Sequence, residues 1–160
     1  MTGSPEAVRI GLISDTHGLL RPEALRFLAG CDHIIHGGDI GKPEILAQLA
    51  EVAPLTVVRG NNDREDWAAH IPETATLRVG QVLLYAIHDL KDLDIDPVAA
   101  GVRVVVSGHS HKPACAEHNN VVFINPGSAG RRRFSLPISC GEIFVEENRV
   151  FARLVTLLVP

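Results

Sequence analysis

Seven side chains that can bind a metal ion occur on five short loops of this sequence. They are two aspartates, one asparagine and four histidines: Asp15, His17, Asp39, Asn61, His88, His109 and His111. Each loop directly follows an apolar run that is typical of a buried strand. Strand after strand therefore ends in a side chain that offers an oxygen or nitrogen ligand. This pattern predicts a site for two metal ions at one edge of a sheet.

Two of these loops carry a pair of candidate ligands separated by one residue. Residues i and i+2 of an extended backbone point to the same side, so Asp15 and His17 can reach one ion, and so can His109 and His111. Carboxylate and imidazole together suit Mn²⁺, Fe²⁺, Zn²⁺ or Ni²⁺ better than Ca²⁺. The loops contain no cysteine, which argues against a structural zinc site of the cysteine type.

The elements that position these loops follow from the apolar pattern. Strands are expected at Val8–Ser14, His33–His36, Leu55–Val58, Thr74–Val79, Val82–His88, Val102–Ser107, Val121–Ile124, Ile143–Val145 and Val150–Leu158. Pro22 and Pro43 each suit the first turn of a helix. Strands and helices alternate at the start, which predicts a parallel sheet there, whereas antiparallel pairings should dominate the second half. We expect two packed sheets with helices outside, in one domain over residues 1–160.

Composition narrows the class of protein. Of the 160 residues, 46% are apolar. The formal net charge of −4 argues against a dedicated nucleic-acid binder, which needs a basic face. One Trp and one Tyr provide no platform for stacking bases. We expect no signal peptide and no membrane span. The three cysteines are scattered, so free thiols and a cytoplasmic location are expected.

The motifs, taken in order, resemble those of the calcineurin-like metallophosphoesterase superfamily. They are Ser14-Asp15-Thr16-His17-Gly18, Gly37-Gly38-Asp39, Gly60-Asn61-Asn62-Asp63, His88 and Gly108-His109-Ser110-His111. The short length and the sequence Asn125-Pro126-Gly127-Ser128 look most like the small bacterial and archaeal phosphodiesterase branch, to which Vps29 is related. This resemblance implies a four-layer α/β/β/α sandwich of two mixed β-sheets flanked by helices.

The resemblance also implies a division of the ligands between two ions. The first ion would be held by Asp15, His17, Asp39 and His111, and the second by Asp39, Asn61, His88 and His109. Asp39 would bridge the ions, and Asp39, Asn61 and His88 would be central to catalysis. Hydroxide bridging the metals would attack phosphorus in line. Mn²⁺ is the ion expected first, with Ni²⁺, Fe²⁺ and Zn²⁺ as alternatives; no other cofactor is expected.

The implied function is hydrolysis of a small phosphate ester, and a diester in particular. Membrane binding and extended nucleic-acid binding are not expected, and a homodimer or homotetramer stays open. The alternative is a Vps29-like protein-interaction module that has the same fold and little or no catalysis. The intact set of seven ligands favours the enzyme.

Two positions depart from the family pattern. Many relatives with monoesterase activity have a histidine where this chain has Asn62, which cannot supply a proton near neutral pH. Asp89 follows His88 where glycine is usual, and it could orient a ligand imidazole or face solvent. Asp63 could support a ligand or stabilise a turn, and Arg131–Arg133 could meet phosphate or lie in a solvated loop.

Overall fold

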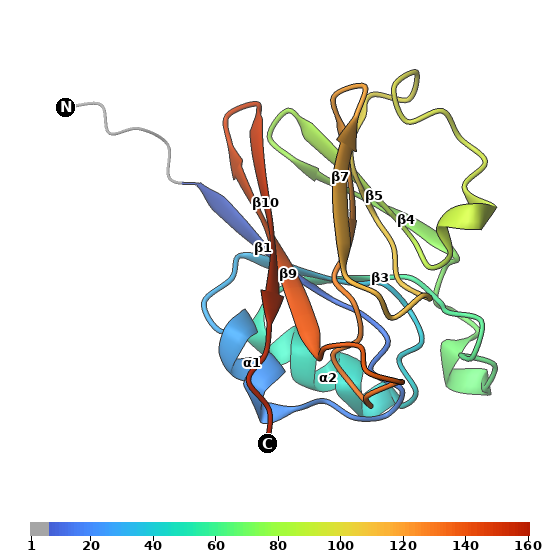
Figure 1. Cartoon of the computed structure of the whole chain (residues 1–160). Helices are drawn as coiled ribbons and strands as arrows, with labels where there is room; N and C mark the ends of the chain where they lie inside the picture. Colours follow the sequence, from blue (N-terminus) through green and yellow to red (C-terminus); the bar gives the residue numbers. More distant parts are fainter. Residues whose placement is uncertain (1–6) are drawn as a thin grey trace.

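A computed structural model describes residues 7–160 of the chain as two five-stranded sheets and two α-helices (Figure 1). The first sheet has the spatial order β10 (Arg149–Thr156), β9 (Ser139–Glu146), β1 (Val8–Ile13), β2 (His33–His36) and β3 (Leu55–Val57). The second has the order β4 (Thr74–Val79), β5 (Val82–Ile87), β6 (Val102–Val106), β8 (Val121–Asn125) and β7 (Ala114–His118). The helical segments are α1 (Pro22–Leu28), α2 (Pro43–Val52) and the short 3₁₀ helices η1 (Asp66–Ala68) and η2 (Leu90–Asp92).

Alternating side chains of the central strands fill two separate cores. Ile10 and Leu12 of β1 pack between the sheets against residues of β5, β6 and β8. Ile13 points to the other side, into a core that includes Leu28 of α1 and Leu49 of α2. Both α-helices therefore cover the outer face of the first sheet, which lies above them in Figure 1.

The outer face of the second sheet has a thinner cover. Tyr85 and Val105 pack there against Leu93 and Ile95, which belong to the segment that follows η2. The expected sandwich of two mixed sheets between helical layers is confirmed. Its fourth layer is a short 3₁₀ helix with connecting chain and contains no α-helix among the described residues.

Strand direction determines where the loops meet. β1 runs parallel to β2, and β2 runs parallel to β3, as expected from the alternation of strands and helices. The hairpins β4–β5, β7–β8 and β9–β10 are antiparallel. In the second sheet, however, β6 is parallel to both of its neighbours, β5 and β8. The carboxyl ends of these three strands therefore lie at one edge of that sheet.

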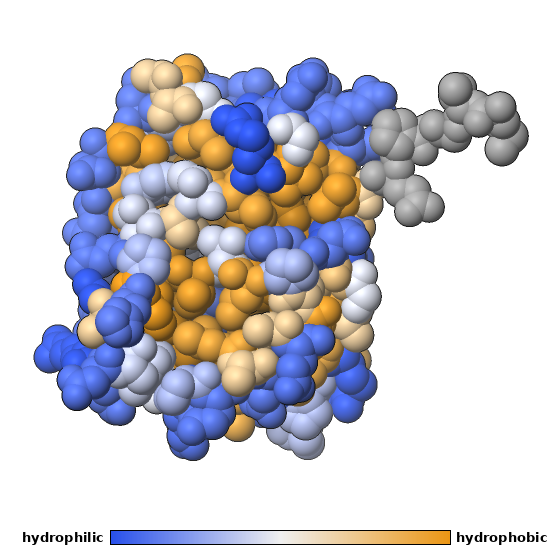
Figure 2. Space-filling model, turned by 180° about the vertical axis from the view of Figure 1, so that it is seen from behind, coloured by the Kyte–Doolittle hydropathy of each residue, from blue (hydrophilic) through white to orange (hydrophobic). Residues whose placement is uncertain are grey.

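The sequence pattern missed one strand. Every residue of β7 is exposed, so the strand lacks the apolar alternation by which strands are recognised. His118 lies in β7 as an exposed residue. Figure 2 shows the molecule from behind. Apolar surface covers much of the centre of the face seen there, and hydrophilic residues lie along its border. No helix within residues 7–160 is long and apolar enough to cross a bilayer.

Candidate metal centre

Loops from both sheets converge at the carboxyl ends of parallel strands. β1, β2 and β3 of the first sheet lead to the loops with Asp15 and His17, with Asp39 and with Asn61. β5 and β6 of the second sheet lead to His88 and to the loop of His109 and His111. This edge is where α/β sheets generally bind ligands. The fold thus brings together all seven side chains that the sequence singled out.

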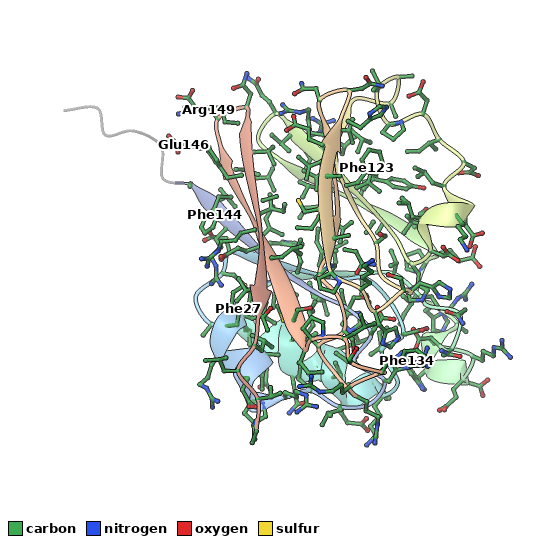
Figure 3. All side chains as sticks on the ribbon, viewed as in Figure 1. Phe27, Phe123, Phe134, Phe144, Glu146 and Arg149 are labelled. Carbon is green, nitrogen blue, oxygen red and sulfur yellow. The ribbon has the colours of Figure 1, made fainter. Side chains whose placement is uncertain are left out.

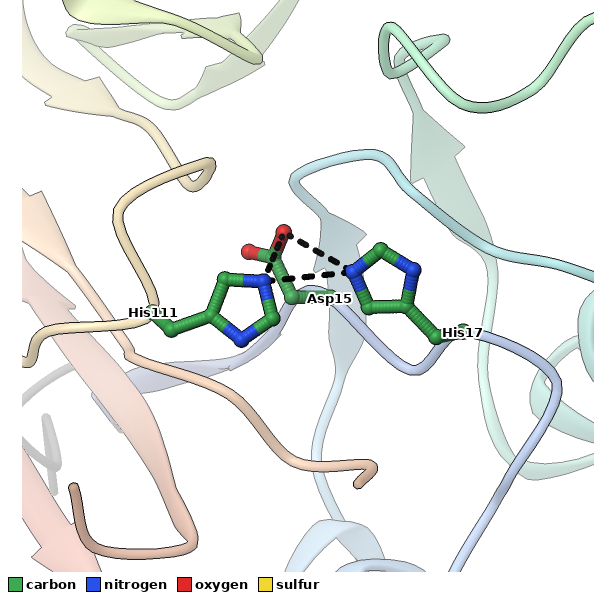
Figure 4. Close-up of side chains that lie close together, drawn as sticks. All are labelled: Asp15, His17 and His111. Atoms are coloured by element: carbon green, nitrogen blue, oxygen red, sulfur yellow. Dashed lines mark hydrogen bonds and ion pairs between the residues drawn. The ribbon is translucent and has the colours of Figure 1, made fainter. Parts of the chain in front are cut away.

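Asp15, His17 and His111 form the first group of candidate ligands (Figure 4). The Nε2 atoms of the two histidines are 3.2 Å apart, and Asp15 Oδ1 lies 3.5 Å from His111 Nε2 and 3.7 Å from His17 Nε2. Ligand atoms that share one ion at about 2.1 Å are separated by roughly 3.0–3.5 Å. Asp15 is fully buried, and its Oδ1 has no hydrogen-bond donor among the described residues. A cation at this point would satisfy that oxygen, so the residues fit a metal ion.

Asp39, His88, His109 and Asn61 form the second group. Asn61 Oδ1 lies 3.0 Å from His88 Nε2 and 3.2 Å from His109 Nδ1. Asp39 Oδ2 lies 3.3 Å from His88 Nε2 and 3.6 Å from His17 Nε2 of the first group. One carboxylate oxygen therefore faces both groups.

The orientation of His88 is set by a backbone contact. Its Nδ1–H donates to the carbonyl oxygen of Gly37 at 2.7 Å, which directs Nε2 toward Asp39 and Asn61. A ligand histidine commonly gives its second nitrogen to such a partner. Burial disfavours the charged forms of both His88 and Asp39. The hydrogen bond and ion pair with Asp39 nevertheless raise the pKa of His88 to about 9. The same contacts lower the pKa of Asp39 to about 2.

Left-handed backbone is concentrated at the candidate ligands. Five of the seven have positive φ: 54° at Asp15, 46° at His17, 57° at Asp39, 73° at His109 and 64° at His111. Such values are uncommon outside glycine and cluster at functional sites. Here they let a short loop turn its side chains back toward the end of the sheet.

Asp63 holds two of these loops together. Its buried carboxylate accepts hydrogen bonds from the backbone N–H groups of Ile40, Gly41 and Gly60. The next residue back, Asn62, donates to Asp39 Oδ1 from its backbone at 2.9 Å and to Asp39 Oδ2 from its side chain at 3.1 Å. Asp63 is thus a supporting residue, and the Asn62 amide contacts the carboxylate between the two groups.

A buried hydrogen-bond chain ties the Asp15 loop to the Asp39 loop. Gly38 N–H donates to His36 Nδ1 at 3.0 Å, which leaves Nε2–H to donate to Thr16 Oγ1 at 3.0 Å. The Thr16 hydroxyl donates in turn to the carbonyl oxygen of Ile40 at 2.8 Å. Burial lowers the pKa of His36 to about 4, so the ring is neutral in this chain. A second histidine of β2, His33, pairs with Thr56 of β3 at 2.8 Å.

The sequence left open the roles of Asp89 and of Arg131–Arg133, which lie around the candidate metal centre. Asp89 Oδ2 is 3.6 Å from His109 Nε2, while its Oδ1 accepts from the backbone of Lys91, so it faces a candidate ligand and begins η2. Arg131–Arg133 are exposed in the loop between β8 and β9. Phe134 of that loop is 89% exposed and is labelled at the lower right of Figure 3. Burial lowers the pKa of His111, and the charge of nearby Arg133 acts in the same direction.

Sequence reasoning gave Asn125 and Ser128 no role at the centre, although it noted their turn. Asn125 Nδ2 donates to the carbonyl oxygen of Gly108 at 2.9 Å, and Ser128 Oγ donates to that of Asp15 at 3.1 Å. Both residues therefore fasten candidate ligand loops. The signal that could have indicated this was the polar turn directly after a buried strand, which is the pattern that marked the ligands themselves.

The comparisons with known proteins agree with the fold and the motifs. Residues 8–148 match the model of the calcineurin-like phosphoesterase superfamily domain. A probable metallophosphoesterase of Methanothermobacter thermautotrophicus is 35% identical over 139 residues, which cover 80% of this chain and 81% of that protein. The chain therefore belongs to the calcineurin-like phosphoesterase superfamily.

Solved structures show the same fold at lower sequence identity. Vacuolar protein sorting 29 (Vps29) from Cryptosporidium parvum has a TM-score of 0.76 at 18% identity, over 94% of this chain and 97% of that one. A novel archaeal phosphodiesterase has a TM-score of 0.72 at 21% identity, over 92% of this chain and 99% of that one. Both an enzyme and a sorting protein thus have this architecture. Metal binding by the seven residues stays a prediction.

Proposed function

We propose that this protein is a phosphodiesterase that depends on two divalent metal ions. The observation that carries the proposal is the position of Asp39 Oδ2, 3.3 Å from His88 Nε2 and 3.6 Å from His17 Nε2. A carboxylate that faces two ligand groups at once suits a bridge between two ions. The similarity to an archaeal phosphodiesterase supports the choice of reaction.

Each of the two groups of residues would hold one metal ion. Asp15, His17 and His111 would hold the first, and Asn61, His88 and His109 the second, with Asp39 shared. The ions, when bound, supply positive charge to phosphate oxygens and lower the pKa of a coordinated water toward about 7. The imidazole and carboxylate donors suit Mn²⁺, Fe²⁺, Ni²⁺ and Zn²⁺, and we expect Mn²⁺ first.

Asn62 restricts the esters that can be cleaved well. Its side-chain amide donates to Asp39 Oδ2 at 3.1 Å and cannot transfer a proton to a departing alkoxide near neutral pH. The leaving group must then depart with little protonation, which favours stable leaving groups such as aryl oxides. We therefore propose that the site prefers aryl or otherwise activated diesters over alkyl monoesters.

A direct comparison of substrates tests this proposal. Metal-depleted protein would be supplied with Mn²⁺ and assayed on bis(4-nitrophenyl) phosphate, 4-nitrophenyl phosphate and an alkyl monoester. We expect turnover of the diester to exceed that of both monoesters and to vanish with chelator. Equal rates on the aryl diester and the alkyl monoester would contradict the role assigned to Asn62, and no turnover despite two bound ions would end the enzyme proposal.

The second candidate function is a protein-interaction module. The similarity to Vps29 and the apolar surface at the centre of the face in Figure 2 favour it. Such a module would bind metal without hydrolysing esters. The assay above separates the two functions, because only the enzyme couples bound Mn²⁺ to turnover.

Cellular location and organisation belong to the same proposal. All three cysteines are free thiols, two of them buried, which suits a reducing cytoplasm. A single domain is supported by the family match over residues 8–148. For the oligomeric state, a homodimer and a homotetramer stay open beside a monomer.

A further inference from the structure

A cavity opens directly beside the second group of candidate ligands. It has a volume of about 610 Å³, and Asn61, His88 and Asp89 form part of its wall. The rest of the wall includes residues from η1, from the start of β4, from η2 and from the chain after η2. A substrate with its phosphate between the two ligand groups would place one of its arms in this cavity.

The cavity wall is strongly acidic. Seven carboxylates and two guanidinium groups line it. One of the arginines, Arg59, already pairs with Glu73 at 3.0 Å. The other, Arg64, donates to the carbonyl oxygen of Asn61 at 3.0 Å, so its charge lies next to the candidate metal centre where phosphate is expected.

Three of the carboxylates have no partner in the part of the chain that the structure describes. The side chains of Asp66, Asp92 and Asp94 form no ion pair within 4.0 Å and no hydrogen bond with any residue from 7 to 160. All three are exposed to the solvent of the cavity, and neither packing nor a helix cap requires their charge. Their combined field would attract a cation and repel an anion that enters beside the phosphate.

We propose that the substrate is a phosphodiester with one positively charged arm, such as an amine or a quaternary ammonium, and that this arm occupies the acidic cavity. The proposal rests on the phosphodiesterase function proposed above and names its substrate class. A nucleic-acid end would bring further phosphates into the same wall, where they would be repelled. The net charge of −4 of the whole chain also repels a polyanion such as nucleic acid.

The size of the effect follows from Coulomb's law. Exposed carboxylates act through water, so each contributes little, and salt weakens them further. Three together should change the ratio of kcat/KM between a cationic and an anionic arm by about tenfold at low ionic strength. The ratio should fall toward one in high salt, where the Debye length is about 3 Å at 1 M.

Three aryl diesters with a common 4-nitrophenyl leaving group would test the proposal. Their second arms would be choline, phenyl and a chain that ends in a carboxylate, which carry a positive charge, no charge and a negative charge. We expect wild-type protein with Mn²⁺ to prefer choline over the carboxylate arm by about tenfold. The triple variant D66N/D92N/D94N should lose this preference, so that its ratio of rates between the choline and the carboxylate diester falls toward one.

A matched control is Glu51→Gln, which removes one exposed negative charge from α2, outside the cavity wall. It should leave the preference unchanged. A triple variant that retains the wild-type ratio would overturn the proposal, and so would a wild-type protein that treats the three arms alike.

Equilibrium binding of the matching non-hydrolysable phosphonates, followed by calorimetry, reports the charge preference without turnover. Tighter binding of the choline phosphonate with no hydrolysis of any diester would support the acidic cavity while ending the enzyme proposal. Hydrolysis of all three diesters with equal phosphonate affinities would support the enzyme proposal and overturn the role of the acidic cavity. The two failures can therefore be distinguished.

Discussion

Left-handed backbone at aspartate and histidine is the feature of single residues that distinguishes the candidate metal centre. Five of the seven candidate ligands have φ between 46° and 73°. Each such residue costs on the order of 1 kcal/mol or more and persists only where its surroundings enforce it. The hydrogen bonds of Asp63 and Asn62 provide that enforcement around Asp39. The sequence predicted which residues would meet, but the extended backbone expected at Asp15 and His17 and at His109 and His111 is wrong, because all four have positive φ.

Close packing around Asp39 gives a prediction for Gly60. A Cβ atom at this position would lie 2.1 Å from Asp39 Oδ1 and 2.2 Å from the Asp39 backbone nitrogen. Gly60→Ala must therefore displace Asp39, and we expect Mn²⁺ affinity to fall by about 10–100-fold, as for other groups that orient metal ligands. Isothermal titration of metal-depleted protein measures this.

Gly141→Ala is the matched control for that change. Gly141 lies in β9, and its added Cβ would be 3.4 Å or more from its neighbours in β10, β8 and β1, which is ordinary contact. We expect its Mn²⁺ affinity to equal that of the wild type. Unchanged affinity in Gly60→Ala would show that Asp39 is not held as the structure indicates.

At the scale of elements, the strands that carry the site were readable from the sequence, and β4 was predicted with its observed bounds, but β7 was missed. His33–His36 was predicted with its observed bounds, and Leu55–Val58 ended one residue late, because buried apolar runs between polar turns are a strong signal. The parallel placement of β6 between β5 and β8 depends on crossover connections, about which periodicity says nothing. β7 has no buried residue and therefore left no pattern to read.

The buried chain through His36 links two strand ends and predicts a pH effect on stability. The folded state holds the pKa of His36 at about 4, whereas an unfolded chain binds the proton near the usual 6.5. Stability is therefore full above pH 6.5 and falls as the pH drops from 6.5 toward 4, by about 3 kcal/mol in all. Urea unfolding in chelator at pH 7 and pH 4.5 measures the loss.

His36→Gln isolates this contribution. Glutamine can accept from Gly38 and donate to Thr16, but it does not titrate. His33 and His111 also have pKa values lowered by burial, and their effects cancel when the two proteins are compared. The raised pKa of His88 acts only above pH 6.5 and the lowered pKa of Asp39 only below 3.8. An equal loss of stability in both proteins would contradict the neutral, buried His36.

At the scale of the whole molecule, the candidate centre lies where the two sheets meet. The first sheet provides Asp15, His17, Asp39 and Asn61, and the second provides His88, His109 and His111. Each proposed ion would therefore be held by residues from both sheets. Metal binding should stabilise the packing of one sheet on the other, because ligands from both must be in place at once.

A stoichiometric metal titration tests the central claim most directly. Metal-depleted protein would receive Mn²⁺ in steps while bound metal and hydrolysis of bis(4-nitrophenyl) phosphate are measured together. We predict that activity appears as the second equivalent binds, and that Asp39→Asn binds both ions weakly and is inactive. Full activity with one bound ion, or an active Asp39→Asn variant, would contradict a two-metal centre that shares Asp39.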